Sequence, residues 1–238
     1  MSPLPGLDRA CLAEFLGTFL LVFAGTGAIV VNAATGGAVT HVGVAMCFGL
    51  VVMLLIIALG DISGAHFNPA VTAAFLLAGQ VRPTRAAAYI VTQLAAALVA
   101  SLAVYILFGD HAMLGATQPR DPTPAGVARV FALELLLTFF LMTVIFCVAT
   151  GPRETGILAG IAIGGTIGLE ALFAGPITGA STNPARSLGP AVVAGRLDHL
   201  WLYLLAPTAG SLLAVPVAAV LRPRPRPAGP LPAPPADL

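Results

Sequence analysis

The sequence ISGAHFNPAVT at residues 62–72 occurs again, with changes, as ITGASTNPARS at residues 177–187. Six of the eleven positions are identical, and two more exchange Ser and Thr. Because Asn caps helix N-termini well and Pro is favoured at the first helical position, each Asn-Pro pair predicts the start of a helix. The apolar segments that follow, about residues 69–79 and 184–195, have about half the length of a membrane span. The repeat therefore predicts two re-entrant half-helices.

The composition is typical of a membrane protein. Hydrophobic residues make up 58% of the 238 residues and charged residues 9%, with a mean hydropathy of +0.97. An ordinary soluble domain has about 25% charged residues. So few charges could not cover the surface of a soluble protein, which excludes a disordered chain and most cytosolic enzymes. The net charge of +1 predicts no nucleic-acid partner.

Six further apolar runs are long enough to cross a membrane. A helix needs about 20 apolar residues to cross a bilayer core of about 30 Å. The runs are continuous and do not alternate with polar residues, which favours helices over a β-barrel. The sequence therefore predicts an all-α integral membrane protein with six transmembrane helices and two half-helices. The predicted spans are about Ala10–Val31, His41–Leu59, Thr84–Phe108, Val127–Thr150, Gly156–Ala174 and His199–Leu221.

The repeat extends beyond the two Asn-Pro segments. Glu14 lies in EFLGTFL in the first predicted span, and Glu134 lies in ELLLTFF in the fourth. Residues 7–108 and 127–221 are therefore predicted to be two repeats within a single domain over 1–238, each with helix, helix, half-helix and helix. Three spans in each half turn the second repeat upside down. Inverted repeats with short, Gly/Pro-interrupted segments point to a transport site near the middle of the membrane.

The arginines predict the orientation of the chain. If the spans alternate, seven of the eleven Arg fall on one side and three on the other. The positive-inside rule then places both termini in the cytoplasm and the protein in a cell membrane as a multi-pass protein. Residues 222–238 are rich in Pro and Arg and are predicted to form a flexible cytoplasmic tail.

The two Asn-Pro-Ala boxes are predicted to face each other near the bilayer midplane. These boxes are Asn68-Pro69-Ala70 and Asn183-Pro184-Ala185. Each helix N-terminus carries partial positive charge, so a cation or proton meets a barrier there. The Asn amides can still donate hydrogen bonds to a small neutral molecule with an oxygen acceptor.

The loops before the boxes need partners for their backbone, because they lie inside the membrane. Their carbonyls are predicted to form a ladder of acceptors along a pore. The loop residues concerned are Gly64, Ala65 and His66 in the first copy, and Gly179, Ala180 and Ser181 in the second. Glu14 and Glu134 are well placed to accept from the N–H groups behind the ladder. Their alternative role is a proton relay, since an acid inside a membrane is a functional candidate.

The symmetry of the boxes breaks where Val71 in the first copy is replaced by Arg186 in the second. A charged Arg inside the membrane must face water or a partner. In a pore it would repel cations and donate to solute oxygens. The alternative is an ion pair that holds the loop.

Together these motifs resemble those of the aquaporin, or major intrinsic protein, superfamily over about residues 7–221. The resemblance implies six tilted helices with two re-entrant half-helices, assembled as homotetramers with one pore per subunit. It also implies passive conduction of water or small uncharged solutes. The sequence has no Cys/His cluster and no catalytic motif, so we expect no cofactor, no metal and no enzymatic activity.

Counting from the boxes, the resemblance implies a selectivity filter of Phe48, Ala171, Ala180 and Arg186. Orthodox water channels have His at the position of Ala171, so this filter is predicted to be wider and more apolar. Glycerol facilitators carry Asp after the Arg and Trp in the filter, whereas this chain has Ser187 and Phe48. The second box and its surroundings look most like the nodulin-like intrinsic protein branch and its bacterial relatives. That branch passes glycerol, urea-sized solutes and metalloid hydroxides such as arsenous or boric acid.

Three other functions remain open at this point. One is an aquaporin used mainly for water. A second is a coupled secondary transporter, because inverted repeats and buried acids occur there too. The third is a structural membrane protein that packs through its small residues. The retained Arg186 and both box asparagines weigh against the last.

Overall fold

The computed structural model describes residues 6–149 and 156–221, and every regular element in that part of the chain is a helix. Six of the helices are long and apolar enough to cross a membrane, which confirms the predicted all-α membrane fold. The predicted tail at residues 222–238 lies outside the described residues. The elements are α1 (Gly6–Ala34), α2 (Thr40–Ser63), α3 (Pro69–Leu77), α4 (Pro83–Phe108), the 3-10 helix η1 (Ala112–Gly115), α5 (Pro124–Ala149), α6 (Gly156–Thr178), α7 (Pro184–Val193) and α8 (Leu200–Leu221).

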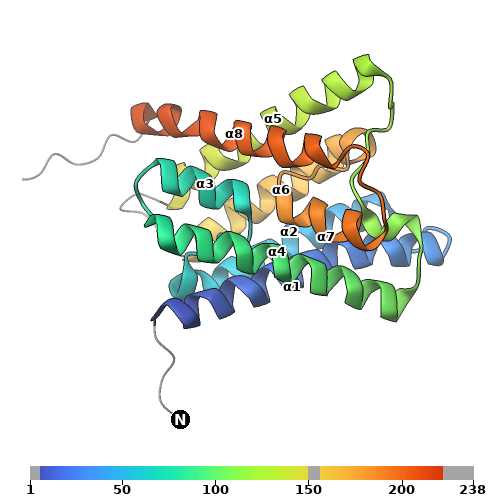
Figure 1. Ribbon diagram of the computed structural model, residues 1–238, viewed down its shortest axis with the longest axis horizontal. Helices are drawn as coiled ribbons and strands as arrows, with labels where there is room; N and C mark the ends of the chain where they lie inside the picture. The colour runs from blue at the N-terminus through green and yellow to red at the C-terminus, as the bar shows by residue number, and fades with distance from the viewer. Residues whose placement is uncertain (1–5, 150–155, 222–238) are drawn as a thin grey trace, which may run out of the picture.

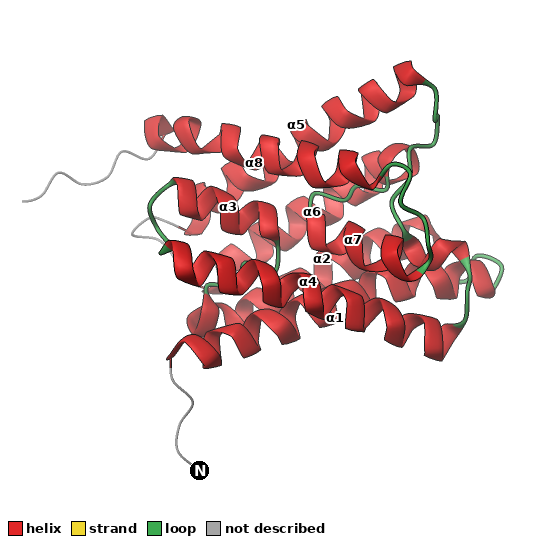
Figure 2. Ribbon diagram, viewed as in Figure 1, coloured by secondary structure: helices red, strands yellow, loops and turns green. Residues whose placement is uncertain are grey.

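The long helices lie side by side as a bundle, with the two short helices between them (Figure 1). Helix α1 begins and α8 ends at the same end of the bundle, which we call the terminal face. The α1–α2 turn and residues 109–123 lie at the opposite end, which we call the loop face (Figure 2). Helix α3 runs from the middle toward the terminal face, and α7 runs from the middle toward the loop face (Figure 1).

The outside of the bundle is apolar and its interior holds the polar groups. Side chains such as Leu54, Ile106 and Leu136 are exposed on the long helices. Glu14 and Glu134, by contrast, have no exposed surface. This reversal of the pattern of a soluble protein is what a hydrocarbon solvent favours.

Glycines let the helices approach closely where the site is built. A Cβ on Gly49 of α2 would lie 2.8 Å from the carbonyl oxygen of Gly164 in α6, so any side chain there would push the two helices apart. On α1, the rings of Phe67 and Phe48 occupy the places that side chains on Gly17 and Gly25 would need. These contacts position α1, α2 and α6 around the centre of the bundle.

Both short helices begin at the predicted Asn. Asn68 caps α3 and Asn183 caps α7, each with extended backbone and with Pro at the first helical position. The loops in front of them share an unusual backbone, because Ala65 and Ala180 both have positive φ angles, of 50° and 40°. Such φ values are uncommon for residues other than Gly. The two halves therefore repeat in local conformation as well as in sequence.

Candidate functional site

The two Asn-Pro-Ala boxes meet in the middle of the bundle. Asn68 Oδ1 accepts from Ala70 N at 2.8 Å, and Asn183 Oδ1 accepts from Ala185 N at 2.9 Å. Each Asn Nδ2 also donates to the opposite loop: Asn68 to the carbonyl of Thr182 at 2.8 Å, and Asn183 to the carbonyl of Phe67 at 2.9 Å. An amide carries two N–H bonds, so one on each Asn stays available.

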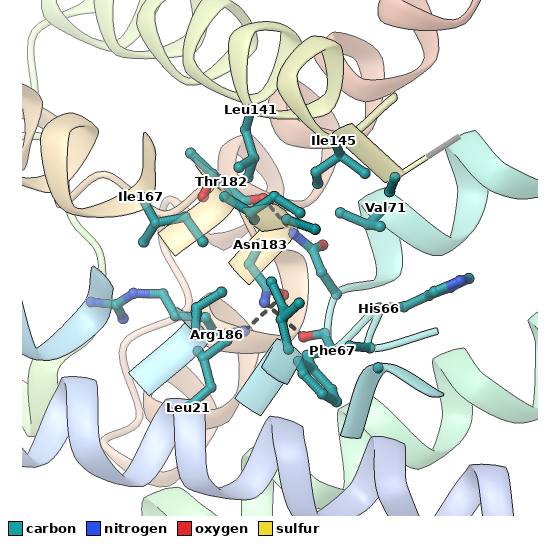
Figure 3. A pocket seen from close by; sticks show the side chains of 18 of the residues that line it. Leu21, His66, Phe67, Val71, Leu141, Ile145, Ile167, Thr182, Asn183 and Arg186 are labelled. Carbon is teal, nitrogen blue, oxygen red and sulfur yellow. Dashed lines mark hydrogen bonds between the residues drawn. The ribbon is translucent and has the colours of Figure 1, made fainter. Parts of the chain in front are cut away.

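A cavity of about 310 Å³ runs past the two asparagines. Asn68, Asn183 and all four predicted filter residues line it, as do Gly64, Ala65, His66 and Ser181 of the predicted loop ladder. Apolar side chains also line this cavity. Figure 3 shows three of them, Leu141, Ile145 and Ile167, grouped around Thr182 and Asn183. The remaining predicted site residues lie outside its lining: Pro69, Ala70, Pro184, Ala185, Gly179, Glu14 and Glu134.

A second cavity of about 240 Å³ lies toward the loop face and shares Phe48 and Ala171 with the first. Gly179, another residue of the predicted loop ladder, lines this second cavity. His41 of α2 also lines it. The predicted filter residues Phe48 and Ala171 therefore lie at the junction of two open spaces.

Arg186 is 2% exposed and lines the main cavity (Figure 3). Its Nη1 donates to the carbonyl of Gly115 at 2.7 Å, and its guanidinium lies 5.0 Å from the centre of the Phe48 ring. Its buried Nε has no hydrogen-bond partner within the described residues. Arg186 is thus held by the backbone carbonyl of Gly115. Within the described residues, no ion pair joins Arg186 to the loop.

Glu14 and Glu134 lie behind the two loops. Glu14 accepts from the backbone N–H of His66 at 2.9 Å and of Phe67 at 2.7 Å. Glu134 accepts from the backbone N–H of Ser181 and of Thr182, both at 2.9 Å. Neither carboxylate lines either of these two cavities, and both bond the backbone of the loops.

His66 lies in the main cavity near the terminal face. Its ring stacks on Phe75 with 4.7 Å between centroids, and its Nδ1 lies 3.1 Å from Thr72 Oγ1. Asp61 lines the same end of the cavity.

Sequence reasoning missed a chain of hydroxyl groups beside Arg186. Thr117 Oγ1 lies 2.7 Å from Ser187 Oγ, which in turn contacts Ser181 Oγ. Ser181 Oγ donates to the carbonyl of Asn183 at 3.0 Å. Thr117 comes from the connection between the two repeats, so no repeated motif could indicate it.

Six spans, two half-helices that meet at their Asn caps, and a cavity lined by one buried Arg define a polytopic membrane protein with an internal solute path. The family model described as "Major intrinsic protein" matches residues 4–217. The chain therefore belongs to the major intrinsic protein family, the family of the aquaporin-type channels.

The chain is similar to several named members of this family. The chain is 49% identical over 210 residues to "Aquaporin NIP1-2" of Oryza sativa subsp. japonica, covering 84% of this chain and 67% of that protein. It is 43% identical over 212 residues to "Nodulin-26" of Glycine max, covering 89% of this chain and 77% of that protein. The solved structure of the aquaglyceroporin from Plasmodium falciparum matches with a TM-score of 0.82 at 28% identity, covering 91% of this chain and 98% of that one.

Proposed function

We propose that this member of the family is a passive channel for water, glycerol-sized polyols and metalloid hydroxides such as arsenous or boric acid, and that it excludes ions and protons. The observation that carries the proposal is the lining of the cavity junction. Phe48 and Ala171 line both cavities, and Ala180 and Arg186 line the main cavity with them. Two alanines leave two walls without bulk, so the passage has room for a solute larger than water.

The polar groups on the lining suit a neutral solute. Arg186 offers only donors, the free N–H of each box Asn is a donor, and the loop carbonyls are acceptors. A polyol hydroxyl both donates and accepts, so it can exchange its hydration for these groups step by step. The apolar side chains of Ile145 and Ile167 face its carbon backbone.

Ions are excluded by fixed positive charge. The N-termini of α3 and α7 meet at the boxes and carry the positive ends of their helix dipoles. The Arg186 charge lies between them and the loop face. A cation would lose its hydration at a point where the two helix N-termini and Arg186 repel it.

The relatives support the solute class. The similar plant proteins are named aquaporins of the NIP group and nodulin-26, and the similar solved structure is titled an aquaglyceroporin. We further propose that the terminal face is cytoplasmic, that the loop face is outside, and that four copies assemble with one pore each. The Arg distribution supports the orientation, and the family resemblance supports the tetramer.

The deciding experiment is light scattering by proteoliposomes after mixing with hyperosmotic glycerol, without any ion gradient. Fast shrinkage followed by fast reswelling is expected, since water first leaves through the channel and glycerol then enters and draws water back in. Fast shrinkage with reswelling no faster than in empty liposomes would show a channel used mainly for water. Flux that appears only with an imposed ion gradient would show a coupled transporter.

The matched control is Ala171→His, which puts a bulky donor ring at the junction. Its glycerol flux should fall while water flux continues. Undiminished glycerol flux in this variant would contradict the filter assignment.

A further inference from the structure

His41 is the residue of interest beyond the predicted filter. It lies in the first turn of α2 and lines the second cavity, where Phe48 and Ala171 form the junction with the main cavity. Among the nine residues that line this space, only Asn32 and His41 have polar side chains. A solute that arrives from the loop face therefore meets His41 just before the junction.

The ring of His41 is tied to a carbonyl that the helix itself leaves free. In an α-helix the carbonyl of Leu172 would accept from the N–H of residue 176, but residue 176 is Pro and has no N–H. His41 Nε2 lies 2.8 Å from the Leu172 carbonyl oxygen and replaces the missing donor. A carbonyl only accepts, so Nε2 must carry the proton.

This contact fixes the chemistry of the other ring nitrogen. A neutral imidazole with its proton on Nε2 has a lone pair on Nδ1. No hydrogen bond joins Nδ1 to the described part of the chain. His41 therefore presents an acceptor beside the second cavity, whereas Arg186, which lines the main cavity next to Phe48, has only donors.

The start of α2 is built to hold His41 in place. Thr40 has a φ of 65°, which is uncommon for a β-branched residue. Asn32 Oδ1 accepts from Thr40 N at 2.7 Å, and Thr40 Oγ1 accepts from Gly43 N at 3.2 Å. On the other side, a Cβ on Gly175 would lie 3.1 Å from His41 Cε1, so Gly leaves the space that the ring needs.

We propose that His41 is a specificity-determining residue, whose Nδ1 accepts a hydrogen bond from the hydroxyl of a neutral solute as it approaches Phe48 and Ala171. The proposal rests on the proposed function and deepens it. Arg186 donates to one hydroxyl oxygen while His41 accepts from a hydroxyl proton, so a polyol is held at two points. Removing one of these two hydrogen-bonding groups should lower the permeability to a polyol more than the permeability to water.

Three variants separate solute recognition from a structural role. His41→Phe keeps an aromatic ring but removes both nitrogens. His41→Gln keeps a donor for Leu172 and an acceptor for the solute. Pro176→Ala returns an N–H to the Leu172 carbonyl and so removes the reason for the fixed tautomer.

The flux readout is the ratio of glycerol to water permeability in proteoliposomes with equal amounts of channel. We expect His41→Phe to lower this ratio about fivefold, the scale of one lost hydrogen bond. His41→Gln should recover most of it. A ratio that His41→Phe leaves unchanged, while the wild type conducts glycerol, would overturn the proposal and leave the proposed function standing.

Nitrogen-15 NMR of the histidine rings gives a readout that does not depend on flux. The His41 signal is assigned by its loss in His41→Gln. We expect the proton on Nε2, and a shift of the Nδ1 resonance when glycerol is added. A ring protonated on Nδ1, or an Nδ1 resonance that does not shift when glycerol is added, would overturn the proposal. Wild-type liposomes without glycerol flux would instead refute the proposed function, and the NMR result would still decide on His41.

Discussion

The two half-helices are held by similar acids in different surroundings. Tyr89 of α4 donates to the carbonyl of Ser63 at 2.8 Å, and Tyr203 of α8 donates to the carbonyl of Thr178 at 2.7 Å. Four residues beyond each Tyr the symmetry ends, because α4 has Gln93 and α8 has Pro207.

Gln93 completes the network on the terminal side. Its Nε2 donates to Glu14 at 2.7 Å and also contacts Thr72 Oγ1 at 3.1 Å. Ser63 Oγ donates to Glu14 at 2.7 Å as well. Glu14 thus has side-chain donors from two long helices in addition to the loop N–H groups.

On the loop side, Thr178 of α6 hydrogen-bonds Glu134, and a connecting segment adds further support. Ser187 and Arg186 are held by Thr117 and by the carbonyl of Gly115, both within residues 109–123. The two halves of the path therefore differ in what fixes them. Long helices supply donors to both halves, and a connecting segment adds support to the half that contains the predicted filter.

The strongest test of this comparison is removal of each acid. Glu14→Ala and Glu134→Ala each leave two buried backbone N–H groups without an acceptor. An unsatisfied buried group costs about 1–3 kcal/mol, so each variant should lose about 2–6 kcal/mol of stability. Glu14→Ala should lose more, since both Ser63 and Gln93 also lose their acceptor, whereas in Glu134→Ala the side chain that loses its acceptor is Thr178. Thermal unfolding in detergent measures the stability of both variants. A larger loss of stability in Glu134→Ala than in Glu14→Ala would contradict this order.

Arg186→Ala tests the charge at the junction. The variant removes the charge beside Phe48 and frees the Gly115 carbonyl. Proton leak should rise at least about tenfold, because a unit charge in a partly buried site is worth more than 1.4 kcal/mol. A pH-sensitive dye inside proteoliposomes measures the leak. Val71→Ala, at the matching position of the first box, is the control and should leave proton leak unchanged.

Much of this site follows from the repeat in the sequence, and the reason is local. Asn caps and Pro at the first helical position are short-range signals, so Asn68 and Asn183 mark the starts of α3 and α7 correctly. Glu14 and Glu134 follow from the same symmetry, since equivalent acids must face equivalent loops.

The rest depends on contacts that no local pattern indicates. Gly115 belongs to a segment with three consecutive positive-φ residues, Ala112, Met113 and Leu114, none of which is Gly. The contact of His41 with Leu172 joins residues 131 positions apart in different repeats. Neither could be predicted from one sequence, because each depends on how the helices pack.

Gln93→Leu tests the hydrogen-bond network on the terminal side. The variant removes a donor from Glu14 but keeps both loop N–H bonds, so the loss should be about 1–3 kcal/mol, smaller than for Glu14→Ala. Solute selectivity should stay as in the wild type, since Gln93 lines neither cavity. Thermal unfolding and the glycerol-to-water flux ratio measure the two effects. A changed ratio would mean that the terminal network also sets the filter.

Thr117→Val, on the loop side, should have the opposite pattern to Gln93→Leu: a small loss of stability with a changed solute selectivity. The substitution keeps the shape and removes one hydroxyl from the chain that links Thr117 to Ser187 and Ser181. Because the two serines can still bond each other, stability should fall by only about 1 kcal/mol. The glycerol-to-water ratio should nevertheless change, since the same segment holds Arg186 through Gly115. If Thr117→Val and Gln93→Leu alter the ratio equally, the segment has no special role in fixing the filter, and the two halves are supported in equivalent ways.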